Sequence, residues 1–400
     1  MRDDIIVVNP AGLDKGGSET LGRQFAELLD CPVVFRLRPK EDYEESGRVH
    51  YFRENEDLDR YNPKLAIINL FDVRKNWFVS KKPEDFVQYF KDRNIKTAFV
   101  YCIRSNQARA VLEGNRYLIE NCDYVLYYSD SLEDIIEPLN KNTIKTDINI
   151  YNFHEDIKPL PLSKRSKIVT TSGRPESIKA LPRFLKNLKE NISNDIFKEL
   201  YFVHQGASFK YSRSGKISGA MSIVNLLYNN DLKNKVLDPA FNPVEKEFEL
   251  TDKLQHNKIN LFQQYNKDNT KDIWPKMLVN IYPALGKIKA DDGSKKEERY
   301  INRHKKYWSK AMEYVQLEMI DYGVPVLFSK EFLKTYEFGK DLLELDFSYE
   351  FYEDIPDILS DILKDKDKYE HIVTKQKEIM TRAQEEINNN FKELINDLAK

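Results

Sequence analysis

The sequence has no long apolar run. Its 400 residues contain no stretch of about 18 apolar residues, the length that a membrane-spanning helix requires. Met1 to Asp4 lead directly into a short apolar segment, whereas a secretory signal peptide starts with a basic region and continues with a longer apolar one. We therefore expect neither a membrane span nor a signal peptide, and we expect a cytoplasmic location.

Cysteine and net charge are also scarce. The three cysteines, Cys31, Cys102 and Cys122, have spacings that suit neither a zinc site nor a disulfide framework, so we expect buried small apolar residues. The formal net charge is only −2, with 63 Lys and Arg against 65 Asp and Glu. Any contact with a polyanion must therefore come from a local basic surface.

Common nucleotide and metal motifs are missing as well. The G-x-G-x-x-G spacing of dinucleotide-binding folds and the G-K-[ST] of P-loops do not occur. No D-x-D cluster is placed directly after a strand, as metal-dependent transferases carry it, and Asp291-Asp292 falls in a polar loop. A bound metal is therefore not implied.

The pattern that is present is an alternation of strands and helices. A chain of this length exceeds the size at which one hydrophobic core keeps growing, so two domains are expected. Short β-branched runs alternate with amphipathic helical patterns, which indicates parallel sheets covered on both faces. In the first half, strands are expected at 5–8, 33–37, 65–71, 97–103, 124–129 and 148–153, with helices around 21–29, 85–93, 107–120 and 131–139.

The alternation pauses at Lys158–Arg165, where two prolines and a cationic cluster predict a linker. Beyond it, strands are expected at 167–171, 200–204, 277–282 and 324–328, with helices near 179–190, 218–228, 303–319 and 369–400. We therefore expect an α/β protein with two Rossmann-like domains and a cleft between them. The first would span 1–160 and receive a C-terminal helix at about 375–400, and the second would span 161–374.

A glycine-containing loop follows the first strand. It extends from Asn9 to Ser18, and its paired glycines, Gly16 and Gly17, let backbone N–H groups approach an anion at the start of the next helix. A plain tight turn capped by Ser18 fits the same residues.

A second candidate lies at the head of the second domain. Ile168–Thr171 leads into Ser-Gly-Arg, with Gly173 at the turn. Arg174 and Lys179 lie five residues apart across this strand-to-helix turn, which can aim a guanidinium and an ammonium at one diphosphate. Such a pair stabilises the charge of a departing nucleoside diphosphate without a metal. The alternative is a solvated basic helix start.

A third candidate extends from Lys310 to Val326. A helix carrying Glu318 ends at Gly323 and is followed by Val-Pro-Val entering a strand, which places the carboxylate near a nucleotide at the strand ends. Glu318 can then accept hydrogen bonds from both ribose hydroxyls. Glu313, five positions earlier, points about 140° away around a continuous helix, so a surface salt bridge is its alternative.

The Leu-Glu-x-x-x-x-Gly-x-Pro-Val of this block resembles the ribose-binding helix of retaining GT-B glycosyltransferases. Within that class the chain is similar to the DNA α-glucosyltransferases of T-even phages, which glucosylate 5-hydroxymethylcytosine in duplex DNA with UDP-glucose. The matching pieces keep one order over the whole chain: Gly12-Leu13-Asp14 with the glycines that follow, Asp123–Asp130, Tyr151-Asn152-Phe153, Gly173-Arg174 with Lys179, and Glu313-Tyr314 with Leu317-Glu318.

The resemblance implies the GT-B architecture, with two Rossmann-like domains facing each other across a cleft, and a UDP-sugar donor, UDP-glucose above all. It also implies front-face transfer with retention, without a protein base or a required metal, in the host cytoplasm. The donor would contact Gly16, Gly17, Gly173, Arg174, Lys179, Glu313 and Glu318, with Arg174 and Lys179 acting catalytically on the diphosphate and Asp14 on the substrate side.

One departure from the family pattern concerns the acceptor side. Where the phage enzymes carry a His-Asp pair after a Tyr, this chain has Tyr101-Cys-Ile-Arg-Ser-Asn106. Arg104 is a candidate contact to substrate or to a DNA phosphate, with a structural salt bridge as its alternative. The usual spacing of two glutamates seven residues apart is missing too, because Lys310 lies eight residues before Glu318. The sugar and the acceptor base are therefore left open.

Duplex DNA with hydroxylated bases is the acceptor that the resemblance implies. Cations concentrate in Lys158–Lys216 and in Lys287–Lys310, and interleaved aromatic residues can stack on a base that has been flipped out of the duplex. The cations include Lys164, Arg165, Lys167, Arg183, Lys186, Lys189, Lys210, Arg213, Lys295, Lys296, Arg299, Arg303, Lys305 and Lys306. Ordinary solvated helix faces are the alternative.

Two other functions stay open. A GT-B glycosyltransferase acting on a cell-wall or lipid-linked polymer should display a basic amphipathic membrane-docking helix, and none stands out clearly. A catalytically idle sugar- or DNA-binding module need not keep Arg174, Lys179 and Glu318, which are all present.

Overall fold

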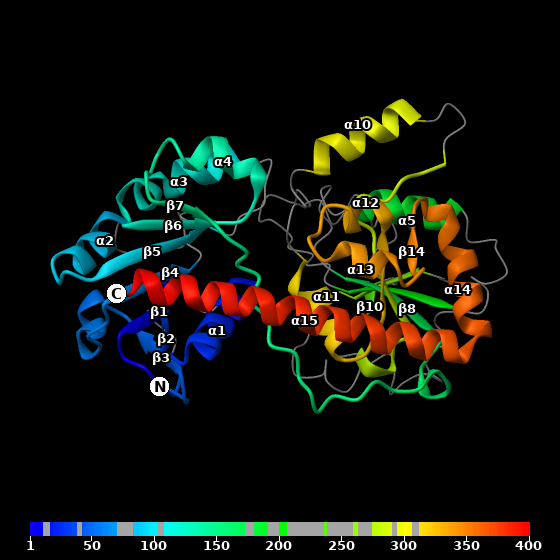
Figure 1. Cartoon of the computed structure of the whole chain (residues 1–400), viewed down its shortest axis with the longest axis horizontal. Helices are drawn as coiled ribbons and strands as arrows, with labels where there is room; N and C mark the ends of the chain where they lie inside the picture. The colour runs from blue at the N-terminus through cyan, green and yellow to red at the C-terminus, as the bar shows by residue number, and fades with distance from the viewer. Residues whose placement is uncertain are drawn as a thin grey trace. The chain divides into compact units, whose positions relative to one another are not determined.

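The computed structural model of the 400-residue chain describes residues 1–10, 17–37, 42–69, 83–101, 108–172, 180–190, 200–205, 236–237, 259–262, 274–289, 294–305 and 312–400. The described residues form two compact units (Figure 1). Unit 1 contains those of Met1–Asn152 and Ala383–Lys400, and unit 2 contains those of Phe153–Trp308 and Met312–Arg382.

Unit 1 is built on a seven-stranded sheet in which every neighbouring pair is parallel. The strand order is β3-β2-β1-β4-β5-β6-β7. The central strands β1 and β4 are buried throughout and apolar up to a final Asn, because helices cover both faces. The strands are β1 Ile5–Asn9, β2 Val33–Arg36, β3 Val49–Phe52, β4 Leu65–Asn69, β5 Lys96–Tyr101, β6 Tyr124–Tyr127 and β7 Thr143–Lys145.

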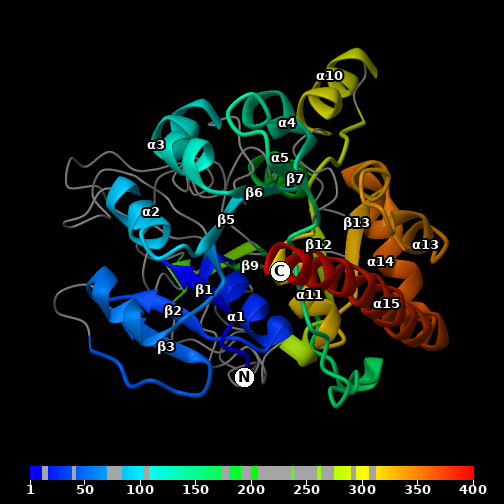
Figure 2. The ribbon, with the colours of Figure 1, turned by 60° about the vertical axis from the view of Figure 1, so that its left-hand side comes forward.

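The helices of unit 1 lie on both sides of this sheet, with α2 and α3 on one side and α1 on the other (Figure 2). Successive residues of a strand point to opposite faces, so Ile6 and Val8 pack in the core beneath α2 and α3. The helical elements are α1 Gly17–Leu29, the 3₁₀ turn η1 Asn55–Arg60, α2 Pro83–Lys91, α3 Ala108–Asn121 and α4 Asp130–Ile136.

Unit 2 repeats this plan. Its seven parallel strands have the order β10-β11-β9-β8-β12-β13-β14. Residues of α5, α14 and α15 share one hydrophobic core with Val169 of β8 and with Val279 and Ile281 of β12. The strands are β8 Ile168–Ser172, β9 Tyr201–Gln205, β10 Val236–Leu237, β11 Ile259–Phe262, β12 Val279–Tyr282, β13 Val326–Ser329 and β14 Ser348–Tyr349.

The helical elements of unit 2 connect these strands. Two have clear local signals: Ser329 caps α12 by accepting from the N–H of Phe332 at 3.1 Å, and Pro356 lies in the first turn of α14. The elements are η2 Leu162–Lys164, α5 Leu181–Glu190, η4 Trp274–Lys276, α10 Ser294–Lys305, α11 Tyr314–Asp321, α12 Lys330–Leu333, α13 Gly339–Leu343, η5 Tyr352–Asp354, α14 Ile355–Lys364 and α15 Lys366–Leu398.

The last helix, α15, contributes to both units. Its first part belongs to unit 2, where Tyr369 lies in the core. Its last part, from Ala383, belongs to unit 1. There Phe391 stacks on Phe25 at 4.7 Å between ring centroids, and the amide of Asn388 donates to the carbonyl of Tyr151 at 3.0 Å. The C-terminal helix therefore returns to the first unit.

Two expected elements differ from the structure. Residues 148–153 are not a strand, because the Asp147 carboxylate accepts from the N–H of Asn149 at 2.9 Å and the N–H of Ile150 bonds to the carbonyl of Ile148 at 2.9 Å. These local bonds replace a strand ladder. The helix expected at 303–319 is interrupted, since Met312 and Glu313 are not helical and α11 begins only at Tyr314. Met312 is 1% exposed, so tertiary packing overrides a helix-forming local sequence there.

The predicted helix at 218–228 lies outside the described residues. Within the described part of the chain, no helix is long and apolar enough to cross a membrane.

Candidate functional site

In unit 2, the strand order reverses at β8 and β12. The chain leaves β8 toward β9 on one side and returns to β12 on the other, so the carboxyl ends of β8 and β12 form a topological switch point. In open α/β sheets ligands bind at such points. Here the Asn280 amide donates to the hydroxyl of Ser172, the last residue of β8, at 3.0 Å. Both side chains are buried, which fixes the floor of the candidate site.

The turn after β12, residues 282–286, forms the second part of this edge. Three hydroxyls fix its carbonyls: Tyr349 donates to Tyr282 at 2.9 Å, Tyr352 to Pro283 at 2.9 Å, and Ser329 to Ala284 at 2.6 Å. Gly286 is required because a Cβ there would lie 2.2 Å from the ring of Tyr352. This turn was not among the predicted elements, although a Pro and a Gly directly after an apolar strand are a turn signal.

Helix α11 supplies the two glutamates that the sequence singles out. Glu313 is the N-cap residue with extended backbone, and Glu318 lies in the second turn. Both side chains are partly exposed, whereas Leu317 between them is fully buried. Because Glu313 precedes the helix, the angle of about 140° expected between the two side chains does not apply to this structure. The helix therefore presents Glu318 at the surface of unit 2 while Leu317 anchors it to the sheet.

Tyr322, which follows α11, has a raised phenol pKa. Burial raises the pKa of Tyr322, and the carboxylates of Glu318 and Asp321 raise it further. The Tyr322 ring packs edge-on against Trp274, with ring centroids 5.8 Å apart. Tyr322 is therefore a neutral side chain that holds the end of α11 against the sheet.

The sequence patterns also did not predict that α11 carries a buried amide. Gln316 is fully buried, and within the part of the chain that the structure describes its side-chain nitrogen and oxygen both lack a hydrogen-bond partner. Asn280 has the same property at its side-chain oxygen. A helical Gln between two Glu residues is indistinguishable from a solvated one by pattern, so no sequence signal could have found it.

Most of the other predicted site residues lie outside the described residues. Gly17 is the first residue of α1 in unit 1. Residues Asp14, Gly16, Arg104, Gly173, Arg174 and Lys179 lie outside the described residues, as does Lys310. Strand β8 ends at Ser172, immediately before Gly173.

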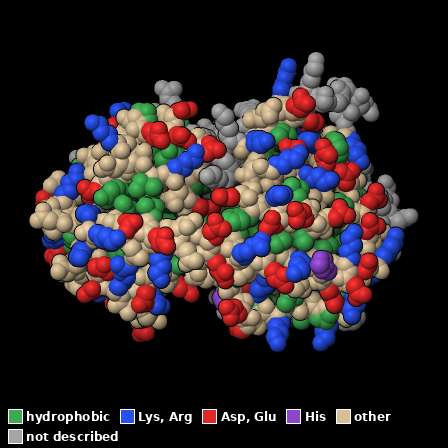
Figure 3. Space-filling view, viewed as in Figure 1, with side chains coloured by type: hydrophobic (Ala, Val, Ile, Leu, Met, Phe, Trp, Pro, Cys, Tyr) green, Lys and Arg blue, Asp and Glu red, His purple; other side chains and the backbone are tan. Residues whose placement is uncertain are grey.

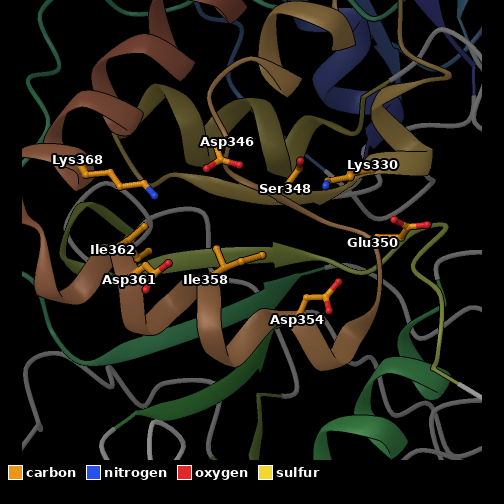
Figure 4. A pocket seen from close by; sticks show the side chains of 9 residues that line it. All are labelled: Lys330, Asp346, Ser348, Glu350, Asp354, Ile358, Asp361, Ile362 and Lys368. Atoms are coloured by element: carbon orange, nitrogen blue, oxygen red, sulfur yellow. The ribbon is translucent and has the colours of Figure 1, made fainter.

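A pocket of about 290 Å³ lies elsewhere in unit 2, between β14 and α14 (Figure 4). Its lining combines four carboxylates with two ammonium groups and contains none of the predicted site residues. The charged lining residues are Asp346, Glu350, Asp354, Asp361, Lys330 and Lys368. A surplus of carboxylates disfavours a diphosphate, so this pocket does not suit a nucleotide donor.

Some cations counted as candidate DNA contacts are already engaged. Arg165 donates to four backbone carbonyls, and Arg183 pairs with Glu297 while its guanidinium lies over the Tyr300 ring. Over the face seen in Figure 3, cationic and anionic side chains alternate on both units. Among the side chains that the structure describes, no group of three His, Cys, Asp or Glu residues is arranged to hold a metal ion.

Two doubly wound parallel α/β units in one chain, completed by a C-terminal helix that returns to the first unit, constitute the GT-B fold of glycosyltransferases. The fold expected from the sequence is therefore confirmed. Comparison with protein-family models gave no match, and comparison with curated proteins gave none.

Three solved structures illustrate the likeness. An α-glucosyltransferase in complex with UDP has a TM-score of 0.66 and 12% identity, and the match covers 96% of this chain and 99% of that one. An α-glucosyltransferase in complex with UDP-glucose and DNA containing an abasic site has a TM-score of 0.66 and 11% identity over 94% of each chain. The sucrose-phosphate synthase of Thermosynechococcus elongatus has a TM-score of 0.54 and 13% identity over 99% of each chain.

Proposed function

We propose that this protein is a retaining glycosyltransferase that moves a sugar, glucose above all, from a UDP-sugar to the hydroxyl of a modified base in duplex DNA, such as 5-hydroxymethylcytosine. The observation that carries the proposal is the match along nearly the whole chain to α-glucosyltransferases, some of which are in complex with UDP-glucose or DNA. The order of the sequence motifs along the chain supports it independently.

Unit 2 is the proposed donor unit. Glu318 on α11 accepts from the ribose hydroxyls, while Arg174 and Lys179, which follow β8, contact the diphosphate. Glu313 and Gly173 belong to the same donor site, and Gly16 and Gly17 of unit 1 lie beside the sugar and the β-phosphate. The rigid turn 282–286 and the bonded pair Ser172 and Asn280 support the proposal, because they hold the strand ends in one conformation.

In the proposed reaction, the acceptor oxygen attacks the anomeric carbon from the face on which UDP departs. The bond between that carbon and the phosphate oxygen breaks, and the acceptor proton passes to a β-phosphate oxygen. Arg174 and Lys179 stabilise the charge that develops on UDP, so electrostatic stabilisation replaces a protein base.

The acceptor must leave the base stack to reach the donor. Flipping a base costs a few kcal/mol, which phosphate contacts and stacking repay. Asp14 and Arg104 are the proposed contacts on the acceptor side. Arg165 and Arg183 are excluded from the DNA surface by their existing partners, which leaves exposed cations such as Arg299 and Lys305 on α10.

The test is to incubate the protein with UDP-glucose and with matched duplexes that carry 5-hydroxymethylcytosine, 5-hydroxymethyluracil or cytosine. UDP release and the masses of the digested nucleosides are followed. A hexose-sized gain on a hydroxymethylated base, absent with cytosine, is the expected result. UDP release without any change in the DNA would keep the donor and reject DNA as acceptor. Wall-polymer or lipid-linked acceptors would then be tested.

A further inference from the structure

The carboxyl end of α11 is held by a network of ions that the donor site does not itself use. Asp321, the last residue of α11, is fully buried. Its carboxylate accepts from the backbone N–H of His154 at 3.0 Å and from the Nδ1–H of the same residue at 2.5 Å. The ammonium of Lys377, on α15, lies 3.1 Å from the carboxylate. His154 and Lys377, which are far from α11 in the sequence, thus both contact its last residue.

Lys377 does more than neutralise this carboxylate. Its ammonium also donates to the backbone carbonyls of His154 at 2.8 Å, Ile157 at 3.0 Å and Asp321 at 2.9 Å. The Lys377 side chain is 16% exposed, and its bonds to the carbonyls of Ile157 and Asp321 are partly buried. A cation at the last carbonyls of a helix is favourable because the negative end of the helix dipole lies there.

A second cation reinforces the same helix end. The guanidinium of Arg165 donates to the carbonyl of Gly323 at 2.7 Å, just after α11, and to that of Leu160 at 2.9 Å. Gly323 has a φ of +73°, and a Cβ there would lie 2.8 Å from the Cα of Pro159. The linker is therefore packed at Pro159 closely against the residue that follows α11.

These contacts lie close to Glu318 along the chain. Asp321 lies three residues after Glu318, and the N–H of Tyr322 bonds to the carbonyl of Glu318 at 2.9 Å. Along the described residues, the main chain passes from unit 1 to unit 2 after Asn152 and returns after Arg382. His154 and Lys377 lie close to these two crossings, so the network ties both to the helix that carries Glu318.

We propose that Lys377 and Asp321 are a positioning pair for the donor site, which hold α11 in the orientation at which Glu318 meets the ribose. The inference rests on the proposed function, since it presumes that Glu318 binds the nucleotide. Neither residue touches the ligand: both act through α11.

A double-mutant cycle tests this role. The dissociation constant of UDP is measured by calorimetry for wild type, Lys377→Met, Glu318→Gln and the double variant, at a temperature where near-ultraviolet circular dichroism shows each to be folded. Lys375→Met is the matched control, because Lys375 lies on the same helix and forms a surface pair with Glu378. We expect Lys377→Met to raise the dissociation constant about tenfold and to have no further effect once Glu318 is Gln.

The outcomes separate the two proposals. An equal loss of affinity from Lys377→Met with and without Glu318 would make the pair merely structural and overturn the inference alone, as would an unchanged affinity. A Glu318→Gln variant that binds UDP like wild type would overturn the donor site and the inference together. If Lys377→Met does not fold, His154→Ala takes its place, since that side chain is 52% exposed. Its expected effect is about threefold, again only when Glu318 is present.

Discussion

At the scale of single residues, Glu318 is the described position on which the proposed donor site depends most. Replacing it by Gln removes the charge while keeping the shape, and the partly exposed side chain contributes little to the core. Hydrogen bonds to a charged group contribute about 1.5–3 kcal/mol, so we expect UDP affinity to fall roughly 10- to 100-fold with an unchanged melting temperature. Calorimetry checks this, with the exposed Glu344→Gln as control. Equal affinities for both variants would remove Glu318 from the site.

The two described cysteines yield a prediction about pH. Burial raises the pKa of the Cys31 and Cys122 thiols from the ordinary 9.0 to about 12. Both thiols stay protonated in the folded protein, whereas in the unfolded chain they ionise above about pH 9. Their contribution to the free energy of unfolding is therefore complete below that pH and is lost between about pH 9 and 12.

Alkylation provides the measurement for these thiols. Treating the native protein with iodoacetamide at pH 8 should leave Cys31 and Cys122 unmodified in a peptide map, while treatment in denaturant should modify both. Rapid native labelling of either would contradict the burial.

The candidate site shows what residue patterns can and cannot predict. The helix that carries Glu318 could be predicted because it ends in Gly and leads into Val-Pro-Val, a local signal, whereas the role of Glu318 stays a prediction. The bond between Asn280 and Ser172 joins residues 108 positions apart, and no spacing rule reports such a meeting. The same holds for the contact between Lys377 and Asp321, which only the packing of α15 creates.

At the scale of elements, the turn from α11 into β13 should be especially intolerant of a side chain. Gly323→Ala adds a left-handed backbone penalty of about 1–2 kcal/mol and a contact of 2.8 Å with the backbone of Pro159. Gly47 has a φ of +58° with open space around it, so Gly47→Ala carries only the backbone penalty. Urea denaturation of both variants should show a clearly larger loss in the free energy of unfolding for Gly323→Ala than for Gly47→Ala. Equal losses would mean that Pro159 moves aside.

The elements themselves were predictable where packing and local preference agree. Long apolar strands such as β1, β4 and β5 follow from their sequence, as do amphipathic helices such as α3. The edge strands β3 and β7 were not predicted, because they are only four and three residues long and depend on pairing with their neighbours. The non-helical Met312 and Glu313 show the reverse case, in which local helix preference loses to burial.

At the scale of the whole molecule, α15 carries core residues for two units, and its two parts can be tested separately. Phe391→Ala removes a fully buried ring stacked on Phe25 and should cost about 3–5 kcal/mol. The amides of β1 and β4 should then lose more protection from hydrogen exchange than those of β12 and β13. The exposed Lys392→Ala is the control. Equal loss in both sheets would mean that the units unfold as one.

The division of α15 between the two units also determines the order in which the units can be completed during translation. On the ribosome, residues 1–152 emerge first, but their core lacks Ala383, Ile387, Phe391, Ile395 and Leu398 until the last stretch is made. At about 5–20 residues per second, some 230 intervening residues keep that gap open for roughly 10–50 s. The unit that is translated first is thus the last to be completed, and the nascent chain exposes a strip of apolar surface beside Phe25 for all of that time.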